Sequence, residues 1–212
     1  MALIRPEDDD IDYNIFSRLG SELEPGMIWV SSGASELGRL DYIKRNGFDI
    51  IGNDWEIKGD YAAQGQAILM ENYRRYISPR YSVRQLLVEH THFNDELKKD
   101  HIKKFLQRCP AQNVVPIINY KEPVSFDETR KMEIAHLIHK GEDAVECIDN
   151  DETAAVICNL VQAPTLIILT SVEGIYKEYN NPKSLIGEIV AKDKYELQEK
   201  IKDIQALCVG AS

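Results

Sequence analysis

The chain has 212 residues and a formal net charge of -10, from 25 lysines and arginines against 35 aspartates and glutamates. This length is enough for one α/β domain with a sizeable core, and the acidic balance disfavours non-specific binding to nucleic acid or to an anionic membrane surface. No apolar run approaches a membrane span, and the opening MALIRPEDDD has no apolar signal core, so we expect a cytoplasmic protein.

Strand and helix patterns alternate along the chain. Four apolar runs are nearly continuous, which predicts buried strands at 27–30, 83–89, 113–119 and 165–170. Apolar side chains at helical spacing predict helices at 61–76, 95–107, 153–162 and 194–207. Asn94 is the expected N-cap of the helix at 95–107. The alternation predicts an α/β fold, namely a three-layer αβα sandwich with a mainly parallel central sheet.

Gly65 lies inside the first of these predicted helices, in the sequence DYAAQGQAILMENY. Glycine is unfavourable there relative to alanine. We therefore expect another backbone to pass close to this position.

Cysteine and histidine give no clear metal signature. None of the four cysteines forms a CxxC pair and their spacing matches no zinc pattern, so we expect them to be reduced and structural. His90 and His92 form an HxH pair that could bind a metal from one face of a strand. We favour the interpretation that this pair lies at the surface end of a strand.

Polar loops follow three of the predicted strands. Open α/β sheets bind ligands at the carboxyl ends of their strands, and the sequences there are SSGAS (31–35), INYKEPVS (118–125) and TSVEGIY (170–176). There is no GxxxxGK[ST] and no GxGxxG, so the chain is not a P-loop protein.

The first loop, in SSGASELGR, combines two hydroxyls and a glycine before a predicted helix start. Backbone N–H groups at such a turn can hold an anion, and Gly33 would allow close approach. An equally good interpretation is a simple strand-to-helix turn, with Ser32 or Ser35 as the helix cap.

The sequence IDNDETAAV places two aspartates around Asn150 at a predicted helix start. Taken alone, helix capping is the better interpretation. In the alternative, Asn150 binds a substrate and Asp151 orients cationic groups near a transferring phosphate, since a carboxylate repels phosphate but can hold lysines or Mg²⁺. The loop LTSVEGIYKE is similarly either a turn closed by Gly174 or a nucleotide-contacting loop.

Taken in order, these segments resemble the amino-acid kinase family, and within it the glutamate 5-kinases, over roughly residues 15–180. The matching segments are VSSGASELGR, AAQGQAILMENY, LLVEHTHFND, NVVPIIN, IDNDETAAV and LIILTSVEGIY. The resemblance implies in-line attack of a small carboxylate, such as glutamate, on the γ-phosphoryl group of ATP carried with Mg²⁺. Such a transition state needs positioning and charge neutralisation. The resemblance also implies a homo-oligomer.

The resemblance also implies roles for individual residues. Asp151 would be catalytic, by organising the cationic groups around the phosphates. Substrate would be bound by Ser32, Gly33, Ala34, Glu122 and Asn150, and the nucleotide by Thr170, Ser171, Gly174 and Tyr176.

The chain departs from the family pattern at several points. Glu122 and Ser171 each stand where the family has aspartate, and the stretch from Glu122 to Asp149 is longer than usual, with DETRKMEIAHLIHK predicted to add a helix. These departures bear on the substrate more than on the fold.

The family's two phosphate-binding lysines have no counterpart here. One belongs to a first strand with a G-[ST]-S turn and the other to a GTGGMxTK-like segment, whereas this chain opens with MALIRPEDDDID and closes with CVGAS. We therefore expect a single domain over 1–212 that is incomplete at both ends. Lys44, Lys121 or Lys177 would have to substitute for the lysines.

Three functions follow as alternatives. In the first, the chain is a shortened carboxylate kinase. In the second, it is a related kinase for another acceptor, such as a nucleoside monophosphate (uridylate kinase-like) or another small acid. In the third, it is a non-catalytic member of the family that binds a ligand or partner. Loss of the first strand would leave an apolar sheet edge, which predicts an obligate oligomer or marginal stability.

Overall fold

The computed structural model describes residues 3–5, 7–120, 127–139, 144–145, 149–170, 173–178 and 181–209. The chain divides into two compact units, Met1–Ile168 and Leu169–Ser212. The first unit contains the sheet and the helices that pack on it. The second contains irregular segments and one long helix, and is described separately.

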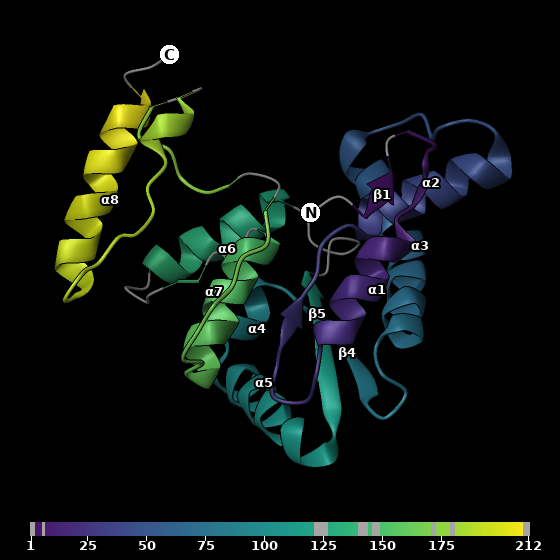
Figure 1. Cartoon of the computed structure of the whole chain (residues 1–212), viewed down its shortest axis with the longest axis horizontal. Helices are drawn as coiled ribbons and strands as arrows, with labels where there is room; N and C mark the ends of the chain where they lie inside the picture. Colours follow the sequence, from purple (N-terminus) through teal and green to yellow (C-terminus); the bar gives the residue numbers. More distant parts are fainter. Residues whose placement is uncertain are drawn as a thin grey trace. The chain divides into compact units, whose positions relative to one another are not determined.

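A parallel three-stranded sheet forms the centre of the first unit (Figure 1). Its order is β3 (Trp29–Val30), β5 (Val114–Tyr120) and β4 (Ser82–Val88), so β5 is the central strand. Every residue of β5 is buried, as expected for a parallel strand covered on both faces. Three of the four predicted strands are therefore confirmed, with their ends shifted by one or two residues.

Helices cover both faces of this sheet, as Figure 1 shows. Alternate residues of β5 point to opposite faces. Val115 and Ile117 pack with side chains of α1 (Tyr13–Glu22) and α3 (Asp54–Tyr76). Ile118 and Tyr120 pack with α5 (Glu96–Arg108) and α7 (Asn150–Val161). The α/β fold and its helix–sheet–helix layering are thus confirmed.

Helices α2 (Ala34–Asn46) and α3 pack in direct backbone contact. A Cβ added to Gly65 would lie 1.8 Å from the carbonyl oxygen of Ala34, and one added to Gly38 would lie 1.8 Å from that of Tyr61. No side chain fits at either crossing point. The expectation that another backbone passes close to Gly65 is therefore confirmed, and α2 supplies that backbone.

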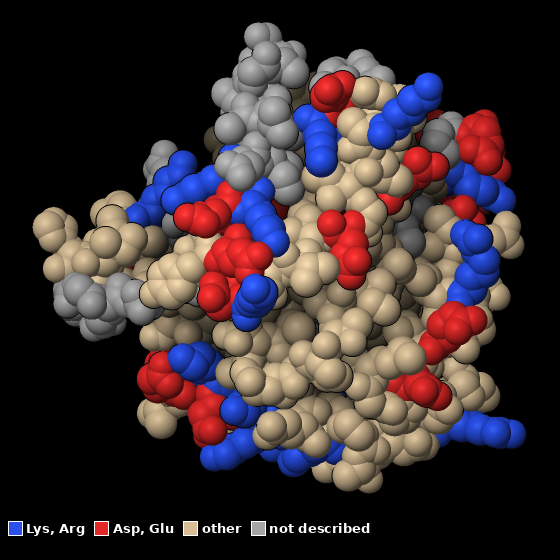
Figure 2. Space-filling view, turned by 60° about the vertical axis from the view of Figure 1, so that its left-hand side comes forward, with Lys and Arg blue, Asp and Glu red and all other residues tan. Residues whose placement is uncertain are grey.

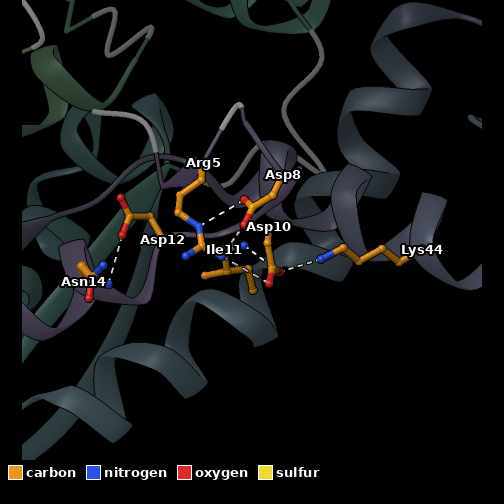
Figure 3. Close-up of polar contacts among 7 residues, drawn as sticks. All are labelled: Arg5, Asp8, Asp10, Ile11, Asp12, Asn14 and Lys44. Carbon is orange, nitrogen blue, oxygen red and sulfur yellow. Dashed lines mark hydrogen bonds and ion pairs between the residues drawn. The ribbon is translucent and has the colours of Figure 1, made fainter.

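A short N-terminal hairpin packs beside α2. Strands β1 (Ile4–Arg5) and β2 (Asp10–Ile11) are antiparallel. Figure 3 shows the polar contacts that hold the hairpin: Arg5 pairs with Asp8 at 2.9 Å, and Lys44 of α2 pairs with Asp10 at 2.6 Å. Asp12 then caps α1 by accepting the backbone N–H groups of Asn14 and Ile15.

The predicted strand at 165–170 is wrong. Among the described residues these six form no strand, and they are exposed, with Ile167 at 75% and Ile168 at 52% exposure. A strand is stable only when its backbone groups find partners, and the sheet's order ends at β3 without this run. Composition alone therefore gave a misleading prediction.

The helices differ from prediction mainly at their starts. α3 begins seven residues early, because Asn53 caps it, and α5 is capped by Asp95 rather than Asn94. Asn94 instead ends α4 (His90–Asn94) and bonds the backbone of Val145 at 2.8 and 2.7 Å. The additional helix predicted after Glu122 is present as α6 (Asp127–His139).

The second unit contains the 3₁₀ turn Pro182–Ser184 and α8 (Lys194–Val209), close to the predicted 194–207. Another 3₁₀ turn, Pro110–Gln112, precedes β5 in the first unit. Among the residues with described placement, no helix is both long and apolar enough to cross a membrane.

Candidate functional site

The SSGA loop, residues 31–34, begins where β3 ends. The backbone N–H of Ser31 donates to the carbonyl of Ile118 at 2.8 Å, so the loop starts in register with β5. Ser31 is buried and Ser32 is exposed. Gly33 has φ +96° and is the N-cap of α2, with no side chain capping that helix. The helix cap is therefore neither Ser32 nor Ser35. The turn has a positive φ at its cap position, and glycine adopts a positive φ more readily than other residues.

One side of Gly33 is covered by Leu3. A Cβ added to Gly33 would lie 2.7 Å from Cδ1 of Leu3, whose side chain is only 4% exposed. The glycine is therefore required by the packing of the N-terminal hairpin as well as by its own backbone conformation. A ligand of this loop has to approach from another side.

Two carboxamides meet at the end of β5. Asn119 is 4% exposed, and its Nδ2 donates to Oε1 of Gln66 on α3 at 2.8 Å. Because that bond fixes which way the Gln66 amide is turned, its Nε2 remains a donor, and this buried atom has no partner among the described residues. A buried donor without an acceptor is costly and suggests a ligand atom as its partner. Sequence reasoning missed both residues, although each lies inside a quoted motif.

The start of α7 reaches the same end of β5. The backbone N–H of Tyr120 donates to Oδ1 of Asn150 at 3.1 Å and to Oδ1 of Asn119 at 2.8 Å. Asp149 is the N-cap of α7, since its carboxylate accepts the N–H of Glu152 at 2.9 Å. Asp151 is exposed in the first turn and has no described side-chain hydrogen bond. The cap is therefore Asp149, and Asp151 is free for another role.

These segments converge at the carboxyl edge of the sheet. The SSGA loop adjoins β5 through Ser31, α3 touches the start of α2 at Ala34, and α7 reaches β5 through Asn150. Three stretches that are distant in sequence thus surround the end of one central strand. This edge is where ligands bind in open parallel sheets.

The roles of the remaining predicted site residues stay predictions. Glu122 and Ser171 lie outside the described residues. Thr170, Gly174 and Tyr176 belong to the second unit. There Tyr176 forms an antiparallel bridge with Leu185 and its hydroxyl donates to Glu173 at 3.1 Å. Partial desolvation and the Glu173 carboxylate raise the pKa of Tyr176.

His90 is buried rather than at the surface, so the prediction for the HxH pair is wrong. The chain turns into α4 directly after β4, and Nε2 of His90 hydrogen-bonds to Glu133 of α6 at 2.6 Å. His92 accepts the N–H of Glu89 and so helps to cap α4. Within the described ranges, no group of three His, Cys, Asp or Glu side chains could hold a metal ion.

Lys44 is not available at the site. It is paired with Asp10 near the far end of α2, ten residues beyond Ala34, which is roughly 15 Å along a helix axis. Lys121 lies outside the described residues, and Lys177 is in the second unit.

On the face shown in Figure 2, acidic and basic side chains are interspersed around a central area without charge.

A parallel α/β sheet with polar loops gathered at its carboxyl edge is the architecture in which open α/β sheets bind their ligands. The chain belongs to the amino acid kinase family: the model of that family matches residues 14–205. The match covers the sheet, the SSGA loop and the start of α7 together.

Curated relatives include three proteins named glutamate 5-kinase. The one from Clostridium perfringens is 28% identical over 153 residues, covering 71% of this chain and 50% of the relative. That from Dehalococcoides mccartyi strain CBDB1 is 29% identical over 200 residues, covering 92% and 46%. That from Myxococcus xanthus is 30% identical over 188 residues, covering 88% and 43%. The chain thus spans about half the length of the curated relatives it matches.

Proposed function

We propose that this chain is a cytosolic, glutamate 5-kinase-like phosphotransferase that binds a small carboxylate at the edge of its sheet and uses ATP as donor. The observation that carries the proposal is the convergence of the SSGA loop, Gln66, Asn119 and Asn150 on the end of β5. The names of the relatives support the choice of acceptor.

The donors at this edge fit a carboxylate. The Oδ1 atom of Asn150 already accepts the Tyr120 N–H, so its Nδ2 group is left to donate. Gln66 is in the same state, because its Oε1 accepts from Asn119 while its Nε2 has no partner in the described part of the chain. Two amide donors, together with the backbone N–H groups of Gly33 and Ala34, suit an acceptor-only group such as an ionised carboxylate.

Asp151 has the properties needed to organise charge around phosphates. Its carboxylate is exposed beside Asn150, and Asp149 performs the capping that would otherwise occupy it. Mg²⁺ carried with ATP phosphates needs only one or two protein carboxylates, so the absence of a three-ligand group among the described residues is compatible with it. Bound there, the ion would neutralise phosphate charge, with Asp151 as its ligand. We assign nucleotide contacts to Thr170, Ser171, Gly174 and Tyr176.

A second candidate function is ligand binding without catalysis. The pairing of Lys44 with Asp10, far along α2 from the loop, favours it, because that lysine does not neutralise phosphate charge at the site. Loss of such cationic groups typically costs orders of magnitude in rate. The two functions differ in a measurable way, since a non-catalytic member would bind glutamate without forming its phosphate.

Thermal-shift and activity measurements test these functions together. Ligands that bind the native state raise the melting temperature by mass action. We expect glutamate and Mg-ATP to raise it, and the full chain to form ADP in the presence of both. A shift with UMP and none with glutamate would instead favour a uridylate kinase-like acceptor. A shift with glutamate but no ADP formation would favour the non-catalytic member.

We also propose that the protein is a homo-oligomer. The exposed apolar residues 166–169 carry no charge, and such an unpaired run tends to associate. Light scattering should give a mass above that of one chain. Ile167→Lys should lower that mass, whereas Ile51→Lys, at a separate position that is 98% exposed, should not. An unchanged mass in both variants would contradict this assignment.

A further inference from the structure

We infer that Tyr73 is a positioning residue that sets the geometry of the SSGA loop; this inference rests on the proposed function. Tyr73 lies on α3 beneath the loop and is completely buried. Its hydroxyl contacts Trp29 of β3 and Ser31, the first residue of the loop, both at 2.7 Å. No motif in the sequence links these three residues.

The hydrogen bonds at Tyr73 form an ordered chain. The indole Nε1 of Trp29 is a donor only, so the Tyr73 oxygen accepts from it. Ser31 Oγ donates to the carbonyl oxygen of Ser32 at 3.2 Å, which uses its single proton. The Tyr73 proton has no other acceptor among the described residues, so we infer that Tyr73 donates to Ser31 in the contact between the two hydroxyls. The order is Trp29, Tyr73, Ser31, Ser32.

This chain of hydrogen bonds ends on a peptide unit of the binding loop. The peptide group is planar and trans, so fixing the carbonyl of Ser32 also fixes the N–H of Gly33 on its opposite side. Gly33 has a positive φ and no side chain that restricts its backbone. The orientation of its N–H group therefore depends on the hydrogen bond to the Ser32 carbonyl. Tyr73 thus aims a backbone donor of the proposed substrate site without touching substrate.

Burial makes the arrangement stiff. Tyr73 is 0% and Ser31 2% exposed, so water does not compete for these hydroxyls. The phenol is held from both sides by ring contacts, with the Phe16 centroid at 5.2 Å and the Trp29 centroid at 6.3 Å. Burial also raises the pKa of Tyr73, which keeps its hydroxyl protonated and able to donate.

The test is Tyr73→Phe, which keeps the ring and removes the hydroxyl. We expect the dissociation constant for glutamate to rise about tenfold, corresponding to one misplaced hydrogen bond, while that for ATP stays within about twofold. Tyr76→Phe is the matched control: it lies on the same helix and its ring packs near Phe16, but no hydrogen bond of its hydroxyl is described.

A double variant separates positioning from general damage. Because the bonds act in series, Tyr73→Phe combined with Ser31→Ala should bind glutamate no more weakly than Ser31→Ala alone. Independent structural losses would add instead. Additive losses, or a Tyr73→Phe variant with wild-type affinity for glutamate, would overturn the inference.

A second measurement does not depend on the identity of the ligand. Amide hydrogen exchange of the peptide containing residues 31–34 should be faster in Tyr73→Phe than in wild type or Tyr76→Phe. If wild-type protein does not bind glutamate, the proposed function fails, and exchange alone then decides the role of Tyr73. Unchanged exchange in this segment would overturn that role.

Discussion

The Cα atom of Gly65 lies directly against the backbone of Ala34, so α3 touches the first residue of α2. A methyl group at this position would come within 1.8 Å of the Ala34 carbonyl oxygen and 2.5 Å of the Gly38 nitrogen. Backbone atoms on both sides cannot move away independently, because each belongs to a helix. The helix that carries Gln66 and Tyr73 is therefore fixed to α2, the helix that begins at the end of the SSGA loop.

Gly65→Ala should consequently prevent normal packing of α2 on α3. We expect a large loss of stability or insoluble protein, since overpacking against backbone has no cheap relief. Yield and thermal unfolding followed by circular dichroism would measure it. Gly52→Ala is the control, because a Cβ there meets only Ile57 at an ordinary 3.8 Å. Equal melting temperatures for both variants would contradict the close contact.

The two aspartates at the start of α7 should separate stability from activity. Asp149→Ala removes the N-cap and should cost about 1 kcal/mol of unfolding free energy. Asp151→Asn should leave that free energy unchanged, because its side chain has no described bond, but should abolish most ADP formation if the protein is a kinase. Urea denaturation and a coupled ADP assay measure the two effects. The opposite pattern would make Asp151 the structural residue.

Leu3 should hold the N-terminal hairpin more firmly than the ion pairs do. Leu3→Ala removes a buried side chain that packs on Gly33, and should cost about 2–5 kcal/mol. Lys44→Ala breaks an exposed pair with Asp10, and we expect little change in the urea midpoint, since exposed ion pairs contribute little. A larger effect for Lys44→Ala than for Leu3→Ala would show that electrostatics holds the hairpin.

Stability should fall in acid partly because of Asp49. The hydroxyl of Tyr61 and the guanidinium of Arg39 bond to this carboxylate, and they lower its pKa. A carboxylate with a lowered pKa stabilises the fold above its unfolded value, about 3.9, and this contribution is lost as pH falls through the folded pKa. Asp49→Asn should therefore be less stable than wild type at pH 7, with the difference shrinking below about pH 4.

The same titration in Asp60→Asn provides the control, because Asp60 is exposed on α3 and has no described ion pair. Its unfolding midpoint should follow that of wild type throughout. If the difference between Asp49→Asn and wild type were constant from pH 7 to pH 3, the carboxylate bonds would not be its cause.

Sequence patterns correctly predicted the elements that are stabilised by local contacts or are buried on all sides. The run VVPIINY is continuous and apolar because β5 has a strand on each side and helices on both faces. The run TLIILT has the same character, yet it forms no strand among the described residues and is exposed. A sequence shows that a segment suits a strand, but the neighbour that would pair with it lies elsewhere in the fold.

The site was predicted only in part, for a similar reason. The loop at Gly33 and the residue Asn150 stand out as local turn and cap signals. The contact between Gln66 and Asn119 joins residues 53 positions apart, and that between Tyr73 and Ser31 joins residues 42 apart. Such contacts depend on how helices cross the sheet, which periodicity does not encode. Adjacent caps such as Asn94 and Asp95 are also locally equivalent, so the helix start was misplaced by one residue.

The division of the chain at Ile168–Leu169 falls within the exposed apolar run. Extended, accessible peptide bonds are preferred substrates for endoproteases, which need several residues in an open conformation. Cleavage there would leave a fragment that keeps both buried clusters and every strand of the sheet among the described residues. The junction is thus a point at which the unit proposed to bind the carboxylate could be separated from the segments proposed to contact the nucleotide.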